Sequence, residues 1–300
     1  MKEFKITIVT PSYNRAHTLP RVYESLINQT FKDFKWIIMD DGSTDNTSEI
    51  VKSFQEENRI EIDYFWNENA KKYYTVFEGI KKVKSPYFAI LDSDDAYVLD
   101  GLEKMYAVIS DLDDSFISAT FNSQFPNGGL VGEEFPEDFD GSILEMRYKY
   151  NVSGDKHTIF KTHKYLNYLR EFEYQSFKHK YAPQKIFFNI YDGRGEKTRF
   201  VNEKIRIYYQ DEDDLASMSN DRVKPSSYEG LMEGHKSFIN SYGYQLIKYP
   251  EALIRNVVGY QHYSMLLNKN FTDVTKGLNH FKFLSILLFP LSFIYTKKKK

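Results

Sequence analysis

The sequence of 300 residues contains no cysteine. This absence excludes disulfide frameworks, cysteine-ligated zinc, iron–sulfur clusters and thiol nucleophiles, so any metal must be held by oxygen or imidazole ligands. The chain also has little net charge, because 40 lysines and arginines oppose 42 aspartates and glutamates. A nucleic-acid binder that works mainly by neutralising phosphates is therefore not expected.

Several catalytic patterns are missing as well. The seven histidines show no paired spacing on one helix, which argues against a histidine-held zinc site. No phosphate-cradling glycine loop of the Walker type and no Gly-x-Ser-x-Gly elbow occurs. The acidic run from Asp211 to Asp214 is interpreted as a solvated loop.

Neither end of the chain carries a hydrophobic run long enough to span a bilayer. The apolar stretch Phe4–Thr10 is too short for a signal peptide, so we expect a cytoplasmic chain that starts with a strand. The stretch Phe281–Tyr295 contains Pro290 and is followed by four lysines, Lys297–Lys300. A run of this kind favours peripheral contact with the anionic inner face of the cell membrane. The alternative is a helix docked on the domain, with a solvated tail.

The first hundred residues alternate between strand-like and helix-like patterns. Strands are predicted over Phe4–Thr10, Phe34–Met39, Ile60–Trp66 and Tyr87–Leu91, with helices between them. Such alternation predicts an α/β fold with a doubly wound, mostly parallel sheet and helices on both faces. After residue 122 the pattern loosens, and residues 226–267 are predicted to be helical.

Polar clusters follow three of the four predicted strands. Asp92, Asp94 and Asp95 follow the fourth strand, and Asp40-Asp41-Gly42 follows the second. Ligands of such sheets bind beyond the carboxyl ends of the strands. Carboxylates this close repel one another unless a cation compensates them, and oxygen ligands suit Mg²⁺ or Mn²⁺. The alternative for each cluster is an ordinary turn or helix cap.

Together these pieces resemble a known family. The segments TIVTPSYNRAHTLPRVYESLINQTFKDFKWIIMDDGSTDNT and ILDSDD are similar to the N-terminal half of family 2 glycosyltransferases with the GT-A fold. The middle of the chain more loosely resembles bacterial capsule and exopolysaccharide members. The resemblance implies inverting transfer from a nucleotide-diphosphate sugar, with UDP favoured by its frequency in the family. It also implies that Pro11, Tyr13 and Asp41 line the nucleobase and ribose pocket, that Asp92 and Asp95 contact substrate, and that Asp94 binds Mn²⁺ or Mg²⁺.

The sequence departs from the family pattern at two places. A Gly-Gly-Lys element is replaced by Asn67–Lys72, which leaves Lys71 or Lys72 to contact the diphosphate. The position where the family places its general base holds Gln184, and an amide cannot accept the proton. Asp155, in an element that the family places facing the acceptor, is then the candidate base; an ordinary turn or an ion pair with Lys156 is the alternative reading.

The resulting hypothesis is a metal-dependent glycosyltransferase that acts on a lipid-linked oligosaccharide or polysaccharide. Residues 1–122 would bind the nucleotide-sugar, 123–225 would face the acceptor, and 226–300 would form a helical extension with a membrane-proximal tail. One alternative is a catalytically silent nucleotide-sugar-binding scaffold, motivated by Gln184. Another is a nucleotidyltransferase, which would need a glycine-rich basic loop after the first strand that this chain does not supply.

Overall fold

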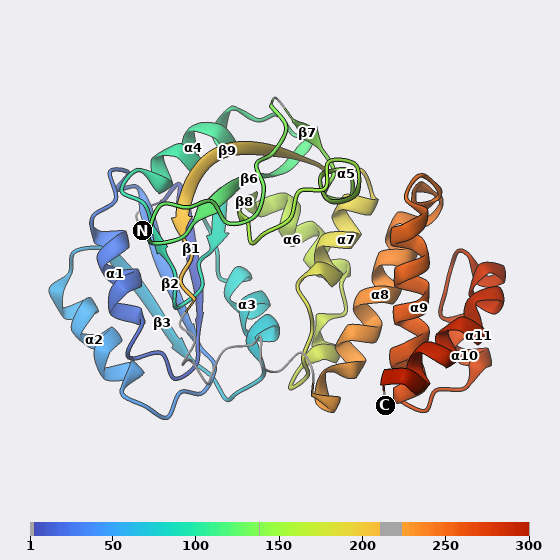
Figure 1. Ribbon diagram of the computed structural model, residues 1–300. Helices are drawn as coiled ribbons and strands as arrows, with labels where there is room; N and C mark the ends of the chain where they lie inside the picture. Colours follow the sequence, from blue (N-terminus) through green and yellow to red (C-terminus); the bar gives the residue numbers. More distant parts are fainter. Residues whose placement is uncertain (1–2, 138, 211–223, 300) are drawn as a thin grey trace. The chain divides into compact units, whose positions relative to one another are not determined.

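The computed structural model describes residues 3–137, 139–210 and 224–299 (Figure 1). The chain divides into two compact units. The N-terminal unit comprises Met1–Lys178 and Lys197–Ala216, and the helical unit comprises His179–Glu196 and Ser217–Lys300. The stretch 123–225, predicted as one acceptor-side half, is thus shared between the two units. The acidic run Asp211–Asp214 lies outside the described residues.

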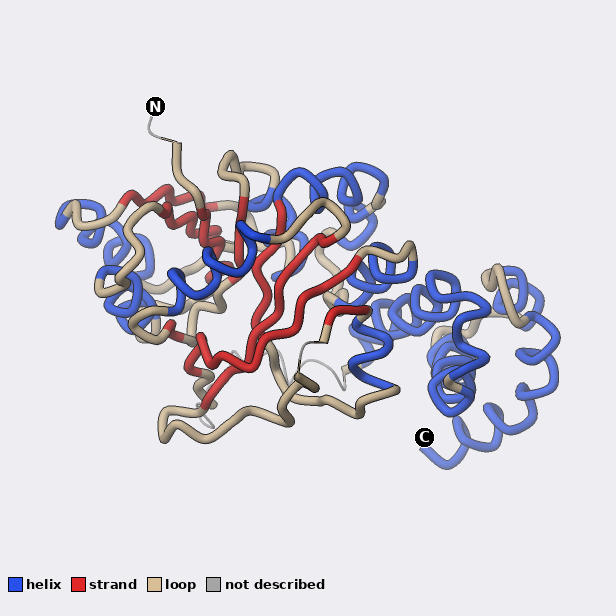
Figure 2. Tube along the Cα trace, turned by 90° about the horizontal axis from the view of Figure 1, so that it is seen from above, coloured by secondary structure: helices blue, strands red, loops and turns tan. Residues whose placement is uncertain are grey.

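The described strands of the N-terminal unit form a nine-stranded sheet in the order β3-β2-β1-β4-β8-β6-β9-β5, with β7 pairing β9. Figure 2 draws the strands in red. The first four strands in that order run parallel, and β8 joins β4 antiparallel. The strands are β1 (Ile6–Ser12), β2 (Phe34–Asp40), β3 (Glu61–Trp66), β4 (Tyr87–Ile90), β5 (Ala96–Tyr97), β6 (Phe116–Gln124), β7 (Asp140–Gly141), β8 (His157–Lys161) and β9 (Lys197–Ile207).

Helices cover both faces of this sheet because the strand residues alternate between the faces. Ile6 and Ile8 of β1 pack into a core with α1, α2 and α4, whereas Val9 and Met39 face Gly79 of α3. The helices of the N-terminal unit are α1 (Leu19–Ile27), α2 (Thr47–Glu57), α3 (Lys72–Ile80), α4 (Gly101–Asp111), α5 (Ile143–Tyr148), α6 (Thr162–Glu171) and the 3₁₀ helix η1 (Tyr174–Phe177).

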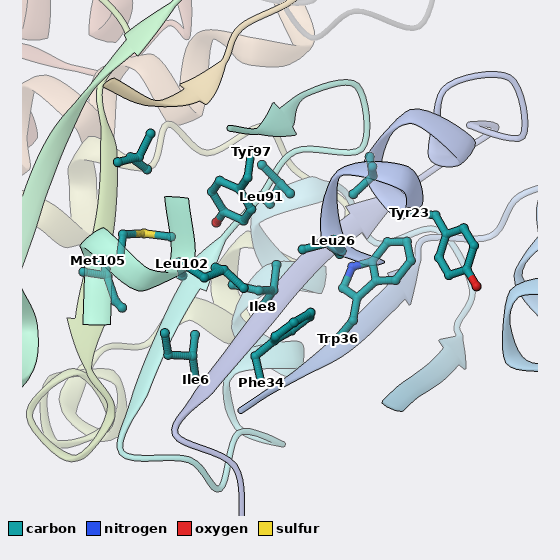
Figure 3. Close-up of a cluster of buried hydrophobic side chains, with 14 of the residues drawn as sticks. Ile6, Ile8, Tyr23, Leu26, Phe34, Trp36, Leu91, Tyr97, Leu102 and Met105 are labelled. Atoms are coloured by element: carbon teal, nitrogen blue, oxygen red, sulfur yellow. The ribbon is translucent and has the colours of Figure 1, made fainter. Parts of the chain in front are cut away.

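The main core lies between the sheet and the helices α1, α2 and α4. Figure 3 shows Trp36 of β2, Leu26 of α1 and Leu102 of α4 among its side chains, and all three are fully buried. The Trp36 indole nitrogen donates to Thr10 Oγ1 at 2.9 Å, which satisfies the one polar atom of that ring. Tyr23 stacks on Phe54 with ring centroids 4.1 Å apart. This packing fixes the strands whose ends carry the candidate site.

The helical unit consists of packed helices. In Figure 1, α8, α9 and α11 lie side by side in orange and red, and α9 contacts both of the others. Asp192 of α7 accepts a hydrogen bond from the buried Tyr242 hydroxyl at 2.6 Å, which ties α7 to α8. The elements are α7 (Lys185–Gly193), η3 (Pro225–Ser227), α8 (Tyr228–Tyr242), η4 (Gly243–Lys248), α9 (Pro250–Leu266), α10 (Phe271–Lys276) and α11 (Lys282–Lys299).

The predicted fold class is confirmed: a mostly parallel sheet with helices on both faces is followed by C-terminal helices. The strand predicted over Phe34–Met39 is β2, and the strand predicted over Tyr87–Leu91 is β4. The segment predicted over Phe281–Tyr295 is the apolar part of α11. None of the helices in the described ranges combines the length and the hydropathy needed to cross a membrane.

Candidate active site

The candidate site lies at the carboxyl ends of β1, β2 and β4. Strand β1 is central and pairs parallel with both neighbours, so the loops that follow the three strands leave the sheet at one edge. Asp41 follows β2, and its amide donates to Ser12 O at the end of β1 at 2.8 Å. Asp92, Asp94 and Asp95 follow β4 on the other side of β1. Residues 41 and 94 therefore share one end of the sheet.

The loops after β1 and β2 are held together by hydrogen bonds around Asn14. The Asn14 amide donates to Ser43 Oγ and the Thr44 amide donates to Asn14 Oδ1, each at 2.8 Å. Asn14 adopts a φ of 53°, a left-handed conformation that asparagine tolerates better than most residues. Tyr13 precedes it and is 42% exposed, whereas Pro11 is buried within β1. The tyrosine ring is therefore the part of this loop that a ligand can reach.

Asp41 is buried and fixed by the segment that leads into α3. Its Oδ1 accepts hydrogen bonds from the Ala70 amide at 2.8 Å and from the Thr75 hydroxyl at 2.5 Å. Burial raises the pKa of Asp41 above its ordinary value, although these hydrogen bonds oppose the change. Gly42 turns the chain at a φ of +86°, and a Cβ there would lie 2.9 Å from the Asn69 amide nitrogen. The turn thus brings the Asp41 loop against the segment from Asn67 to Ala70.

Lys72 is the lysine that reaches the carboxylates after β4. Its Nζ lies 2.8 Å from Asp92 Oδ1, whereas Lys71 is exposed and precedes α3 with a φ of 76°. Burial alone would raise the pKa of Asp92, but the Lys72 ammonium, together with Arg206, holds that pKa below its usual range. Lys72 is in turn kept protonated, because Asp92 raises its pKa despite burial. Of the two candidates Lys71 and Lys72, only the second forms this pair.

The three carboxylates after β4 form a compact cluster. One oxygen from each of Asp92, Asp94 and Asp95 lies within 4.8 Å of the others. Burial and the neighbouring Asp92 raise the pKa of Asp94, and burial raises that of Asp95 to about 7, although Arg206 opposes it. Each carboxylate therefore disfavours charge on the next, which is the situation that a bound cation relieves.

The cluster fits a hard divalent cation. Its ligands are carboxylate oxygens, which Mg²⁺ and Mn²⁺ prefer. Asp95 is buried, and both of its carboxylate oxygens already have partners: Oδ2 lies 3.1 Å from Arg206 Nη1, and Oδ1 accepts a hydrogen bond from the Tyr209 amide at 3.1 Å. Arg15, which is 8% exposed, lies 4.0 Å from Asp94 and holds it less tightly than Lys72 holds Asp92. Asp94 is thus the best placed ligand of the three, because Lys72 and Arg206 hold Asp92 and Asp95 more closely.

Arg206 of β9 connects this cluster to Asp155. It is 4% exposed, and its guanidinium lies 3.1 Å from Asp95 Oδ2 and 3.3 Å from Asp155 Oδ1. The same group donates to Ser123 Oγ at 3.0 Å and to the Asp155 carbonyl at 3.1 Å. Burial and the Arg206 charge hold the pKa of nearby His157 well below its usual value, so His157 is neutral. Arg206 therefore supplies the positive charge that compensates the carboxylates of Asp95 and Asp155.

Asp155 lies on an exposed loop of the N-terminal unit, with its side chain 53% exposed. Gly154 before it has a φ of +93°, and a Cβ there would lie 2.5 Å from the Val131 carbonyl oxygen. This close approach of two loops is what glycine permits, and it sets the position of Asp155 beside Arg206. Gln184 belongs to the helical unit, where it is the N-cap residue of α7. The structure thus brings Asp95 and Asp155 to Arg206, with Asp92 and Asp94 beside Asp95, while the Lys156 ammonium donates to Asn122 Oδ1 and to the carbonyls of Val131 and Glu133.

Arg206 and Arg15 are residues of this edge to which the sequence patterns assign no role. Arg206 lies far from the carboxylates in the sequence and reaches them because β9 pairs with β5, which follows Asp95 directly. An arginine inside an otherwise apolar strand segment, Ile205-Arg206-Ile207, was the available signal, since a buried charge requires a partner.

Replacing Arg206 with methionine is expected to lower the free energy of unfolding of the N-terminal unit by about 3 kcal/mol, because Asp95 is left buried without its counter-charge. The loss grows as pH rises through about 7. Burial already raises the folded-state pKa of Asp95, so its ionised form destabilises the fold, and without Arg206 that pKa rises further. Urea unfolding followed by tryptophan fluorescence measures this unit, because both tryptophans, Trp36 and Trp66, lie within it.

Arg199→Met is the matched control, since Arg199 lies on the same strand but pairs with Asp140 at the surface. We expect this change to cost less than about 1 kcal/mol. Equal losses for the two variants, or an Arg206→Met loss independent of pH, would contradict the assigned role of Arg206.

Comparison with known proteins agrees with this geometry. The sequence model of glycosyl transferase family 2 matches residues 7–193. A GalNAc(5)-diNAcBac-PP-undecaprenol beta-1,3-glucosyltransferase of Campylobacter jejuni is 24% identical over 288 residues, 94% of this chain and 89% of that protein. An uncharacterized glycosyltransferase of Rickettsia bellii is 36% identical over 103 residues, 34% of this chain. The chain spans only 15% of that protein and 24% of two further Rickettsia relatives.

Two solved structures share the fold. TarS of S. aureus, residues 1–349, in complex with UDP-GlcNAc, matches with a TM-score of 0.64 at 16% identity, over 99% of this chain and 93% of that chain. The mannosyltransferase PcManGT of Pyrobaculum calidifontis, in complex with GDP-Man and Mn²⁺, matches with a TM-score of 0.55 at 14% identity, over 89% and 74%. The family match covers more than half of the chain and includes the carboxyl ends of β1, β2 and β4, where the candidate site lies. The chain therefore belongs to family 2 of the glycosyltransferases.

Proposed function

We propose that this glycosyltransferase transfers a sugar, with inversion, from a UDP-sugar to a lipid-linked oligosaccharide or polysaccharide at the cytoplasmic face of a membrane, and that it uses Mn²⁺ or Mg²⁺. The observation that carries the proposal is the carboxylate cluster after β4, placed beside the loops that end β1 and β2. A diphosphate donor needs positive charge at this place. Lys72 and Arg15 are already paired with Asp92 and Asp94, so these two charges alone do not neutralise a diphosphate.

A divalent cation held by Asp94 would neutralise the charge that develops on the departing diphosphate. Lys72 is positioned to add a fixed charge on the same side, through its contact with Asp92. Tyr13 would stack on the nucleobase, and Asp41 would hold the loop that accepts the ribose. Support for the UDP donor comes from TarS, which binds UDP-GlcNAc, and support for the metal comes from PcManGT, which binds GDP-Man and Mn²⁺.

Asp155 is proposed as the general base. Its carboxylate would take the proton of the acceptor hydroxyl as that oxygen bonds to the anomeric carbon, while the diphosphate leaves with the electron pair of the broken bond. Arg206 fixes one carboxylate oxygen of Asp155, and half of the side chain is open to an acceptor. Inversion follows, because attack and departure occur on opposite faces of the sugar.

The lipid-linked acceptor is proposed from the relative that aligns along almost the whole chain. The name of the Campylobacter jejuni relative specifies an undecaprenol-linked acceptor, and the alignment covers 94% of this chain. Such an acceptor is anchored in a membrane, so an enzyme that acts on it must work at the membrane surface.

A donor screen tests the proposal. A panel of UDP-, GDP- and dTDP-sugars is added to the full chain with and without Mn²⁺, and unfolding is followed by thermal shift. We expect one UDP-sugar to raise Tm by about 3 °C or more only when Mn²⁺ is present, since a ligand at 100 times its Kd adds about 2.7 kcal/mol. Stabilisation by a GDP-sugar would contradict the UDP assignment, and stabilisation that ignores Mn²⁺ would contradict the metal.

The second candidate function is a nucleotide-sugar-binding scaffold that performs no transfer, and the observation that favours it is Gln184 at the family's base position. The two functions differ in turnover. Incubation of the stabilising donor with a lipid-linked acceptor fraction releases nucleoside diphosphate if the enzyme transfers sugar. Donor binding without release or transfer to any acceptor in the fraction would favour the scaffold.

A further inference from the structure

Helix α11 buries polar side chains and exposes apolar ones, which is the opposite of an ordinary surface helix. Its polar side chains Ser285, Ser292 and Thr296 are 0%, 0% and 4% exposed. Seven of its large apolar side chains, by contrast, are between 42% and 72% exposed, namely Phe283, Ile286, Leu287, Leu291, Phe293, Ile294 and Tyr295, whereas Leu284, Leu288 and Phe289 are half-buried. A helix docked on a soluble unit normally buries its apolar stripe and exposes the polar one.

Hydrogen bonds to α9 fix this orientation. Gln261, fully buried, donates to Ser285 Oγ at 2.8 Å and accepts from the Ser292 hydroxyl at 2.6 Å. One turn further along, His262 Nδ1 and Thr296 Oγ1 lie 2.9 Å apart. The spacings of seven and four residues place the three α11 side chains on one helix face. Since each polar contact would be lost on rotation, α11 cannot turn its apolar side toward α9 without leaving buried polar groups unpaired.

The exposed apolar side chains form one continuous surface. Leu287, Leu291 and Ile294 follow one another at helical spacing and are 60%, 52% and 54% exposed. Scattered apolar residues are ordinary on a protein surface, but a contiguous patch rimmed by charge marks an interaction surface. We name the exposed side chains of α11 the apolar face.

Charge identifies the partner of the apolar face. After Asp273 the chain contains no acidic residue, while Lys276, Lys282 and Lys297–Lys300 are all basic. Lysines thus flank the apolar face at both ends, and the Lys297 ammonium lies 4.7 Å from the centre of the Phe293 ring. A second copy of the chain would bring like charges together, whereas an anionic lipid surface attracts them.

The length of α11 agrees with a helix that lies in the surface of a bilayer. Its 18 residues extend over roughly 27 Å, and Pro290 interrupts their apolar run. Among the described helices, none meets the requirements for crossing a membrane. A helix with one apolar face, flanking lysines and no acidic residue is typical of insertion at the boundary between headgroups and acyl chains.

We propose that the apolar face of α11 is a membrane-docking surface that inserts into an anionic bilayer, with Gln261 and His262 of α9 holding the helix so that its apolar side faces the lipid. This inference depends on contacts within the helical unit alone and does not require the donor, metal or base assigned to the N-terminal unit.

Vesicle flotation of the full chain tests the surface, with phosphatidylcholine vesicles that contain about 30% phosphatidylglycerol and with phosphatidylcholine alone. The native chain is expected to float with the anionic vesicles and much less with the neutral ones. Leu287→Glu is expected to reduce the partition coefficient about tenfold or more, because it places a carboxylate in the apolar face. Leu99→Glu is the matched control: Leu99 is 63% exposed in the N-terminal unit, against 60% for Leu287, and this variant should float like the native chain.

Lys297→Glu combined with Lys298→Glu tests the charge separately and should weaken flotation without changing the apolar face. Circular dichroism of each variant checks that the helices remain folded. The inference is overturned if the native chain ignores anionic vesicles, or if Leu287→Glu and Leu99→Glu float equally well. It is also overturned if the native chain is a dimer that Leu287→Glu separates while flotation is unchanged, because the apolar face would then bind a second copy.

Discussion

Asp94→Asn is expected to lower kcat/KM for sugar transfer by about 10³-fold, since loss of a ligand that holds the cation removes several kcal/mol of transition-state charge stabilisation. The substitution keeps the shape of the side chain and removes its charge. Initial rates with radiolabelled donor and a lipid-linked acceptor fraction measure the effect. Calorimetric titration with Mn²⁺ should show correspondingly weaker cation binding.

The stability of this variant separates a lost ligand from a damaged fold. Burial and Asp92 raise the pKa of Asp94, so its ionised form destabilises the native state at neutral pH. Asn removes that repulsion, and Tm should stay the same or rise while activity falls. Asp114→Asn is the control, because the Asp114 side chain is 85% exposed and lies outside the carboxylate cluster. Full activity in Asp94→Asn would refute the metal assignment.

Asp155→Asn is expected to lower kcat by about 10²- to 10⁴-fold while the Kd of the donor stays unchanged. The amide cannot accept the acceptor proton, but the backbone carbonyl of residue 155 can still receive the Arg206 hydrogen bond. The loop should therefore keep its position, and the change should appear in the chemical step. Single-turnover rates and donor titrations separate these two quantities.

A rescue experiment decides between Asp155 and the position of Gln184. Gln184→Glu is introduced into the native chain and into Asp155→Asn. If Asp155 is the base, the added carboxylate leaves the double variant as slow as Asp155→Asn. Recovery of activity in the double variant would assign the base to position 184. Glu134→Gln, at an exposed carboxylate of the N-terminal unit, controls for a general change of charge and should remain fully active.

The strands of the parallel half of the sheet could be predicted closely because each is a short run rich in β-branched and aromatic residues that ends at a polar turn. The run Phe34–Met39 appears as β2, Phe34–Asp40, and Ile60–Trp66 appears as β3, Glu61–Trp66. Strand β3 is only partly buried and includes Glu61 and Asp63. A strand buried on both faces, such as β2, requires continuous apolar residues, and a solvated strand end requires polar ones. Both requirements act locally, so both are readable in the sequence.

The pairing of charges in the site could not be read in the same way. A carboxylate cluster after a strand is a local pattern, but its counter-charges come from Lys72 at the start of α3 and from Arg206 on β9. Arg206 reaches Asp95 only because β9 pairs with β5. Neither the choice of Lys72 over Lys71 nor the contact of Arg206 with Asp155 follows from sequence spacing, since each depends on how distant elements pack.

The amino-acid order alone determined the alternation of strands and helices, the acidic turns at strand ends and the absence of thiol chemistry, because these properties depend on neighbouring residues. It also placed an apolar stretch before the terminal lysines. It did not determine which side of that stretch packs on the protein, since apolar residues occupy nearly every position. Only the tertiary structure decided that Ser285, Ser292 and Thr296 face α9 and that the apolar side chains face outward. The physical reason is that a buried polar group needs a partner, and the partners Gln261 and His262 belong to another helix.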